Sequence, residues 1–265
     1  MKNQIDMTQG SIGIKILKYA IPLALTEILQ QLFNAADIAV IGQYSGKEAM
    51  AAVGSNSPVI GLLVNLFVGI SLGSNVIIAK AIGQGDKKTI SNAVHTSILI
   101  ALLGGFFMTV FGELIAGNVI RLLSVPDEVF AMAEKYLRIY LIGMPVIVLY
   151  NFEAAILRSC GNTRTPLIAL VISGITNVIL NLFFVAVLGM DVDGVSLATV
   201  ISNVVSSGIL FVYLLKTDMD IKVHIKKLRI HGKVLLNILK IGVPAGIQGM
   251  IFSFANIVIQ SAVNS

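Results

Sequence analysis

The sequence predicts an all-α membrane protein, in which a six-helix transmembrane lobe is followed by a seventh helix that starts a second, parallel repeat. Three observations predict this fold. Hydrophobic residues make up 56% of the 265 residues and charged residues only 12%, with a mean hydropathy of +0.89, whereas about a quarter of a soluble domain is charged. Seven apolar runs are each long enough to cross a bilayer, which takes about 20 helical residues. The basic residues gather in alternate connections between these runs.

The seven expected spans are helices, because a helix pairs its backbone polar groups within one segment and so can lie in lipid. A strand of a membrane barrel would alternate with a period of two, and these runs do not. Polar connections separate the runs at residues 45–48, 83–88, 125–128, 161–164, 191–194 and 216–233. The expected cores of the spans are residues 14–41, 59–81, 96–120, 136–157, 167–188, 195–215 and 234–263.

The first and the seventh runs resemble each other at a constant offset of 222 positions (18 to 240). Lys18 matches Lys240 and Pro22 matches Pro244. Because many membrane transporters are built from internal repeats, we expect a second unit to begin near residue 234. The chain is then expected to be a fragment of a longer protein. The expected domains are an amino-terminal six-helix lobe (1–216), a cytoplasmic basic linker (217–233) and the first helix of a truncated second lobe (234–265).

Lysine and arginine are distributed unevenly between the two sides of the predicted bundle. Fifteen of the 19 lie on the side that holds the N-terminus and the second, fourth and sixth connections, and four lie on the other side. Cytoplasmic loops carry such an excess. We therefore expect a multi-pass protein of the cytoplasmic membrane with its N-terminus inside. Six spans return the chain to the inside, which makes the two halves parallel.

Composition and motifs exclude several classes of function. The formal net charge is +5, but the basic residues lie between apolar runs and the chain has no Trp, so no nucleic-acid partner is expected. Cys160 is the single cysteine, which rules out an internal disulfide. No Ser/His/Asp set, HExxH or CxxC motif is present, so no enzyme is expected. No nucleotide-binding loop is present either, so we expect no cofactor beyond a coupling ion that supplies the energy.

Polar residues form one stripe along the first expected span. Glu27, Gln30, Asn34 and Asp37 follow a 3-4-3 spacing, which at about 100° per residue places them in one narrow arc of a helix. A charge in hydrocarbon costs about 2.5–3.5 kcal/mol on insertion scales. The stripe predicts either a seam of hydrogen bonds to neighbouring helices or a binding site, and the binding site is favoured for Asp37.

Neutral oxygen-bearing side chains on the fifth and sixth spans match this carboxylate. Ser173, Asn177 and Asn181 recur every four residues on one face, and Thr199 begins a similar face on the next span. A carboxylate among amide and hydroxyl oxygens suits Na⁺, and the same group, once desolvated, can take up a proton instead. The residues leave the choice between these two ions open.

The other acids and the histidines are expected to be structural. Glu113 and Glu153 lie near the ends of their spans, with Arg158 close to Glu153, so both can reach an interface. His95 could relay protons, but a structural role at the interface is favoured. The two histidines of the 216–233 connection are expected to be solvated.

Four segments carry a resemblance to a known family. They are residues 22–37, 69–75 with 83–86, 158–166, and 177–181 with 194–199. Together they resemble the multidrug and toxic compound extrusion (MATE) transporters. The resemblance implies twelve helices in two lobes around a central cavity, and a protein that is a monomer at full length. It also implies export of cationic or amphipathic small molecules across a lipid bilayer, in exchange for H⁺ or Na⁺.

Carried over residue by residue, the cation site of the family falls on Asp37, Asn177, Asn181 and Thr199. Glu27, Gln30 and Asn34 would support it, and Na⁺ would bind at Asp37, Asn177 and Thr199. Members of the family that bind Na⁺ in this lobe often have a second Asp where Asn181 stands. This departure favours Asp37 as a lone proton carrier.

Two other interpretations of the sequence remain open. A lipid-linked sugar flippase of the same superfamily would need a strongly cationic cavity, and no Lys or Arg lies in the middle of a span. A seven-helix receptor or retinal protein would have its N-terminus outside, against the charge distribution. Lys240, the best candidate for a retinal linkage, is expected at the membrane interface.

Overall fold

The computed structural model describes residues 12–123 and 125–264, with side chains from 13 to 255. The ends of the expected domains at residues 1 and 265 lie outside these ranges. The described chain is helical, with a short π-helix, η1, and a short 3₁₀ helix, η2. The elements are α1 (Ile12–Tyr44), α2 (Gly46–Gly83), α3 (Lys87–Leu122), α4 (Asp127–Ile142), α5 (Met144–Ser159), α6 (Arg164–Asn181), η1 (Leu182–Val187), α7 (Val192–Lys216), η2 (Ile225–Lys227) and α8 (Gly232–Asn264).

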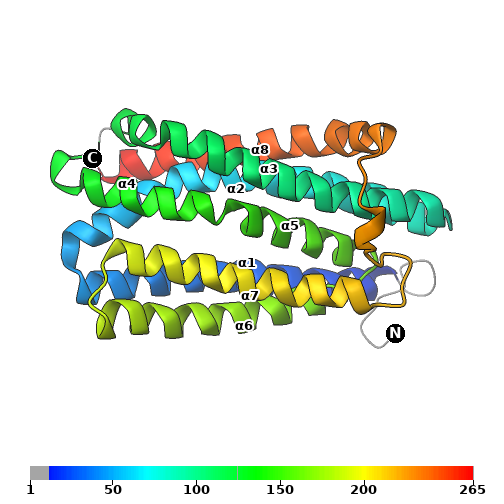
Figure 1. The fold of residues 1–265 in the computed structure, drawn as a ribbon, viewed down its shortest axis with the longest axis horizontal. Coiled ribbons are helices and arrows are strands. Elements are labelled where there is room, and N and C mark those ends of the chain that lie inside the picture. Colours follow the sequence, from blue (N-terminus) through cyan, green and yellow to red (C-terminus); the bar gives the residue numbers. More distant parts are fainter. Residues whose placement is uncertain (1–11, 124, 265) are drawn as a thin grey trace.

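The helices run lengthwise beside one another, as Figure 1 shows. In that view α1, α6 and α7 lie on one side of the bundle, and α2, α3 and α8 lie on the other, with α4 and α5 between them. Helix α5 packs against α2, α3 and α7. Ten of its 16 residues are buried, so its side chains face protein on several sides.

Two contacts show which parts of the chain meet at one end of the bundle. The Tyr19 hydroxyl donates to the carbonyl of Arg158 at 3.2 Å. The Lys87 ammonium lies 3.2 Å from the Asp220 carboxylate. The start of α1, the end of α5, the start of α3 and residues 217–231 thus share one end, which we call the linker end (Figure 1). This is the grouping of connections that the charge distribution predicts.

Five described helices are long and apolar enough to cross a membrane, or six if the bent pair α4–α5 counts as one span. The sequence predicted seven spans. The difference is α1, which has 33 residues but is not among these apolar helices. Its polar stripe, with Glu27 and Asp37, lowers its hydropathy. The expected helix is present, but its apolar character alone does not identify it as a span.

The fourth expected span, 136–157, is longer than predicted and broken. Helices α4 and α5 meet at a bend of 50°. Pro145 lies in the first turn of α5, where its missing N–H is harmless but the preceding helix cannot continue straight. A Cβ atom at Gly143 would lie 2.5 Å from Val200, so glycine permits the close approach of α7. The expected connection 125–128 was also too long, because Asp127 begins α4.

The linker, predicted at residues 217–233, occupies residues 217–231 because α8 begins at Gly232. His224 and most of the charged side chains of the linker are exposed, as the sequence predicted. Ile221 and Val223 are buried against the bundle. The backbone N–H of His224 donates to Nε2 of His95 at 3.0 Å. The backbone N–H of His231 likewise donates to the Thr96 hydroxyl, at 3.1 Å. Apolar and hydrogen-bonding anchors therefore hold this charged segment to α3.

His95 is buried, and both of its ring nitrogens are engaged. Nδ1 lies 2.6 Å from the carbonyl oxygen of Ser91, which requires Nδ1 to carry a proton and donate it. Nε2 then accepts the N–H of His224, and the two imidazole rings stack at 6.2 Å. The structural role favoured for His95 agrees with these contacts.

Helix α8 packs closely along α2 through glycines. A Cβ atom at Gly69 would lie 2.1 Å from the backbone nitrogen of Gly246, and one at Gly73 would lie 2.3 Å from the carbonyl oxygen of Ile238. Only hydrogen fits at these two positions. Small residues allow membrane helices to approach in this way.

Candidate cation-binding site

Asp37 lies in the half of α1 away from the linker end, and its side chain is buried, with 7% exposed. The Asn181 side-chain amide donates to Oδ1 of Asp37 at 2.5 Å. The Thr199 hydroxyl lies 3.4 Å from Oδ2. In the described part of the chain no lysine, arginine or histidine pairs with Asp37. The carboxylate is therefore surrounded by neutral partners.

The four residues expected to bind the cation come together from α1, α6 and α7. Asn181 also donates to Oδ1 of Asn177 at 3.2 Å. Asn177 in turn lies 3.5 Å from the Thr199 hydroxyl, as a donor. The side-chain oxygen of Asn181 is buried and has no hydrogen-bond partner. This orphaned acceptor beside Asp37 is available to a proton donor or to a cation.

The end of α6 places Asn181 against α1. Asn181 is the last residue of α6, and the chain continues directly as the π-helix η1. The N–H of Leu188 bonds back to the carbonyl of Phe183, and Gly189 ends the segment with a φ of 67°. Such π-helical turns are often found at functional sites. Both α6 and η1 pack against α1.

The other polar residues of the α1 stripe do not join this cluster. Glu27 and Asn34 are exposed on the described chain, and Gln30 is half-buried. Glu27 lies ten residues before Asp37, which is about 15 Å along a helix. The common arc predicted from the 3-4-3 spacing places these side chains on one face, but α6 and α7 enclose only Asp37. A supporting role for the three stays a prediction.

Sequence reasoning missed two tyrosines of α4 next to the site. Tyr136 is buried with 6% exposed, and the charge of Asp37 acts on both Tyr136 and Tyr140. The two rings stack with centroids 6.3 Å apart. Their spacing of four residues, on one helix face, was a usable signal. It pointed only to aromatic packing, because nothing in the sequence showed that α4 passes by Asp37.

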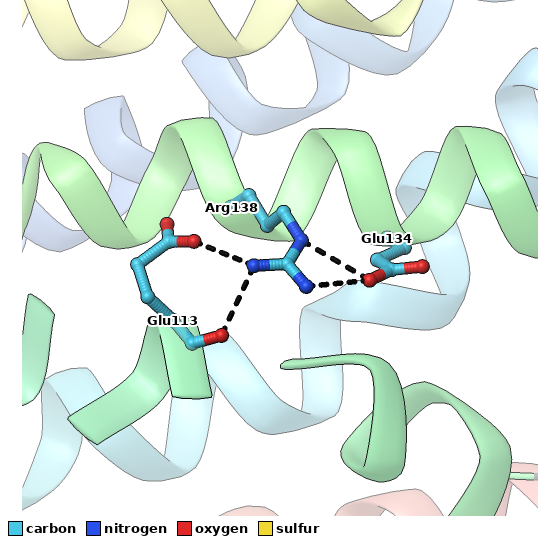
Figure 2. Close-up of polar contacts among 3 residues, drawn as sticks. All are labelled: Glu113, Glu134 and Arg138. Atoms are coloured by element: carbon cyan, nitrogen blue, oxygen red, sulfur yellow. Dashed lines mark hydrogen bonds and ion pairs between the residues drawn. The ribbon is translucent and has the colours of Figure 1, made fainter. Parts of the chain in front are cut away.

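Glu113 belongs to a different kind of site (Figure 2). Arg138 donates through Nη1 to the Glu113 carboxylate at 2.8 Å, and through Nη2 to the Glu134 carboxylate at 2.7 Å. It also donates to the backbone carbonyl of Glu113 at 3.0 Å. The arginine thereby ties α3 to α4. This agrees with the structural role expected for Glu113.

The expectation for Glu153 was wrong. The sequence placed Glu153 near the membrane interface with Arg158 close by. In the structure the Glu153 side chain, on α5, is fully buried. Its Oε2 accepts a hydrogen bond from the Ser207 hydroxyl at 2.9 Å. The enclosure of α5 by three other helices, which the order of hydrophobic runs does not reveal, is the physical reason.

The fold and this buried polar site define a multi-pass helical membrane protein with an acid held inside one lobe. The MatE family model matches residues 22–183, and the chain belongs to this family. Membership leaves no support for a retinal protein or receptor. The flippase interpretation, within the wider superfamily, remains a competitor.

Individual relatives and solved structures agree with the family assignment. The chain is 30% identical to "Probable multidrug resistance protein YoeA" of Bacillus subtilis, over 97% of this chain and 57% of that protein. It is 31% identical to "Probable multidrug resistance protein NorM" of Thermotoga maritima, over 92% and 54%. The solved structure "Crystal structure of MATE in the bent conformation" superposes with a TM-score of 0.87 at 28% identity, over 93% and 55%. The chain therefore spans about half the length of the relatives it matches.

Proposed function

We propose that the full natural chain is an ion-coupled antiporter that exports amphipathic or cationic drugs, with Asp37 as the coupling carboxylate. The observation that carries the proposal is a buried acid whose partners are all neutral. Such a group can change its charge, because no fixed cation holds it ionised. The names of the relatives YoeA and NorM supply the class of substrate.

The residues around Asp37 fit a change of charge. The Asn181 amide and the Thr199 hydroxyl donate to the ionised carboxylate. When Asp37 is protonated, its hydroxyl becomes a donor, and the unpartnered side-chain oxygen of Asn181 is the nearby acceptor for it. Each protonation state thus has a hydrogen-bonding partner.

Na⁺ is the alternative ligand. Hard cations take oxygen ligands, and Asp37, Asn177 and Thr199 would supply a carboxylate, an amide and a hydroxyl oxygen. Asn181 contributes an amide instead of a second carboxylate, which leaves the site with a single negative charge. For that reason we propose the proton as the coupling ion of this lobe.

Helix α1 supplies the moving part. Pro22 interrupts its hydrogen-bond ladder because it has no N–H to donate, and the hydroxyl of Thr26 donates to the Pro22 carbonyl at 2.8 Å. Protonation of Asp37 removes a buried charge and weakens the attachment of α1 to α6 and α7. The helix can then bend near Pro22 and release drug outward.

The proposal is tested in everted membrane vesicles that contain the full natural chain. We expect a fluorescent cation such as ethidium to accumulate in the vesicles when a proton gradient is imposed. If ethidium accumulated equally when only a Na⁺ gradient was imposed, Na⁺ and not the proton would be the coupling ion. No response to either gradient, together with movement of a lipid-linked sugar, would favour the flippase.

Orientation, cellular membrane and oligomeric state belong to the same proposal. We propose a monomer in the cytoplasmic membrane with the linker end inside. Cysteines placed at Lys226 and Lys47, with Cys160 replaced, lie at opposite ends of the bundle. In intact cells an impermeant thiol reagent should label position 47 alone. Labelling of position 226 from outside would reverse the orientation.

A further inference from the structure

Glu153 is a second buried acid that the proposed transport mechanism does not use. None of its side chain is exposed. One carboxyl oxygen accepts the hydroxyl of Ser207 across the α5–α7 contact at 2.9 Å. The other, Oε1, is buried and has no hydrogen-bond partner. We propose that Glu153 and Ser207 form a second proton-binding site, separate from the Asp37 site.

The first reason is that the structure provides no cation for Glu153. Arg158 lies five residues further along the same helix, but it does not pair with Glu153 in the described chain. Its own Nε is buried without a partner. An isolated ionised carboxylate is far more costly to bury than a neutral carboxylic acid. A proton on Oε1 removes that cost.

The surrounding titratable groups do not replace this missing cation. Within α5, the Tyr150 hydroxyl donates to the carbonyl oxygen of Pro166 at 3.4 Å, and not to Glu153. The titratable or charged groups near the linker end of the helices packed against α5 are Lys80 of α2, His95 of α3, Arg164 of α6, and Tyr213 and Lys216 of α7. None of these makes an ion pair or hydrogen bond with Glu153.

The second reason is that the oxygen set is too small for a metal cation. The site offers two carboxyl oxygens and the Ser207 hydroxyl, which already donates to one of them. A hard cation takes about six oxygens or more. A proton needs a single oxygen, and Oε1 supplies it.

The site is also at a different depth from Asp37. Thr199, a partner of Asp37, and Ser207, the partner of Glu153, are both on α7 and eight residues apart. Eight residues span about 12 Å along a helix, and Ser207 is the one nearer the linker end. The lobe would then bind two protons at two levels, one at each acid.

Infrared difference spectroscopy between acidic and alkaline pH tests this inference on the full natural chain in lipid. The C=O band of a protonated carboxylic acid should appear at acidic pH and be lost at alkaline pH. Glu153→Gln keeps the size of the side chain but cannot exchange a proton, so it should remove one component of this band. Glu113→Gln is the matched control. It should leave the Glu153 component unchanged, because Glu113 pairs with Arg138 and makes no contact with Glu153 or Ser207.

A second variant keeps the test decisive if Glu153→Gln does not accumulate in the membrane. Ser207→Ala removes the hydrogen bond to Oε2 and should shift the frequency of the Glu153 component. Identical spectra for the parent and either variant would overturn the inference. Loss of the Glu153 component on adding Na⁺ at constant acidic pH would also overturn it, since the ligand would then be a metal cation. The spectra do not depend on drug transport, so this result is independent of the proposed antiporter activity.

Discussion

The acids of the Arg138 cluster and Asp37 are similar groups in opposite surroundings. Glu113 and Glu134 share one guanidinium, with oxygens 2.8 and 2.7 Å from its nitrogens (Figure 2). Asp37 has an amide and a hydroxyl instead. A carboxylate beside arginine is held in its charged form, whereas one among neutral donors in a buried site can lose or gain its charge. The partner, more than the acid, decides whether a carboxylate ties helices together or carries an ion.

The largest expected effect comes from adding a charge to the neutral site. Asn181→Asp would place a second carboxylate next to that of Asp37. Two negative charges within hydrogen-bond distance of each other favour a bound cation or a shared proton. We expect the rate of dye export driven by a Na⁺ gradient to be about tenfold higher in the variant than in the parent. A tenfold change corresponds to a free-energy difference of about 1.4 kcal/mol. Vesicle transport with a Na⁺ gradient measures it. Asn181→Ser is the control, and unchanged ion dependence in Asn181→Asp would count against a cation site here.

The next effect comes from removing the fixed charge of the other cluster. Arg138→Leu leaves Glu113 and Glu134 without their cation and unties α3 from α4. We expect a melting temperature lower by a few degrees, with the coupling ion unchanged. Arg138→Lys should recover only part of this loss, because an ammonium cannot bridge both acids as a planar fork does. If Arg138→Leu were as stable as the parent but its export depended on a different ion, the Arg138 cluster would take part in ion coupling. The contrast with the Asp37 site would then be wrong.

A smaller effect is expected for the weaker donor of the neutral site. The Thr199 hydroxyl lies 3.4 Å from Asp37, compared with 2.5 Å for Asn181. A hydrogen bond of ordinary strength contributes about 1 kcal/mol, so Thr199→Val should slow proton-driven export by about fivefold. Thr199→Ser, which keeps the hydroxyl, should export at the parent rate. A parent rate in Thr199→Val, together with a loss in Thr199→Ser, would show that the methyl group matters and not the hydrogen bond.

The smallest effect is expected at Asp86, an acid that is exposed to water and not buried like Asp37. Asp86 precedes α3, and its carboxylate accepts the backbone N–H of Thr89 at 3.0 Å and the Thr89 hydroxyl at 2.6 Å. These hydrogen bonds hold the pKa of Asp86 below its usual value. Because the folded-state pKa is the lower one, the stabilisation is present above the unfolded pKa and is lost as pH falls through the folded value.

Asp86→Ala should therefore speed hydrogen exchange in the first turn of α3 at neutral pH, since a helix cap is lost. The difference from the parent should narrow in acid. A difference that persists unchanged in strong acid would mean that the charge of Asp86 plays no part.

Much of the helical fold could be predicted from the sequence, because long apolar runs with polar breaks leave few alternatives in lipid. The meeting of Asp37 with Asn177, Asn181 and Thr199 was also predictable, although the chemistry of those side chains alone left the coupling ion open. The break at Gly143 was predictable only in part. Pro145 marks a place where a helix cannot continue straight, but the close approach of α7 at Gly143 depends on the packing of distant helices. The enclosure of Glu153 and the position of Tyr136 beside Asp37 depend likewise on neighbours distant in sequence.

The linker was predicted only in part for a related reason. Its charges correctly indicated an exposed connection, but nothing in them indicated that Ile221 and Val223 are buried or that His95 of α3 accepts a hydrogen bond from the linker. Two apolar residues in a charged segment are a weak signal by themselves. The hydrophobic cluster that the packed helices form gives these two residues a place to bind.

The central claim is that Asp37 couples an ion to export, and Asp37→Asn tests it most directly. The full natural chain is reconstituted in liposomes, a proton gradient is imposed, and the uptake of a fluorescent cation is followed in parent and variant. Asn keeps the shape of the side chain and can still hydrogen-bond Asn181 and Thr199, but it cannot change charge. The account predicts that the variant binds the dye while its transport no longer responds to the gradient. Gradient-driven transport at the parent rate, with equal amounts of protein in the liposomes, would contradict it.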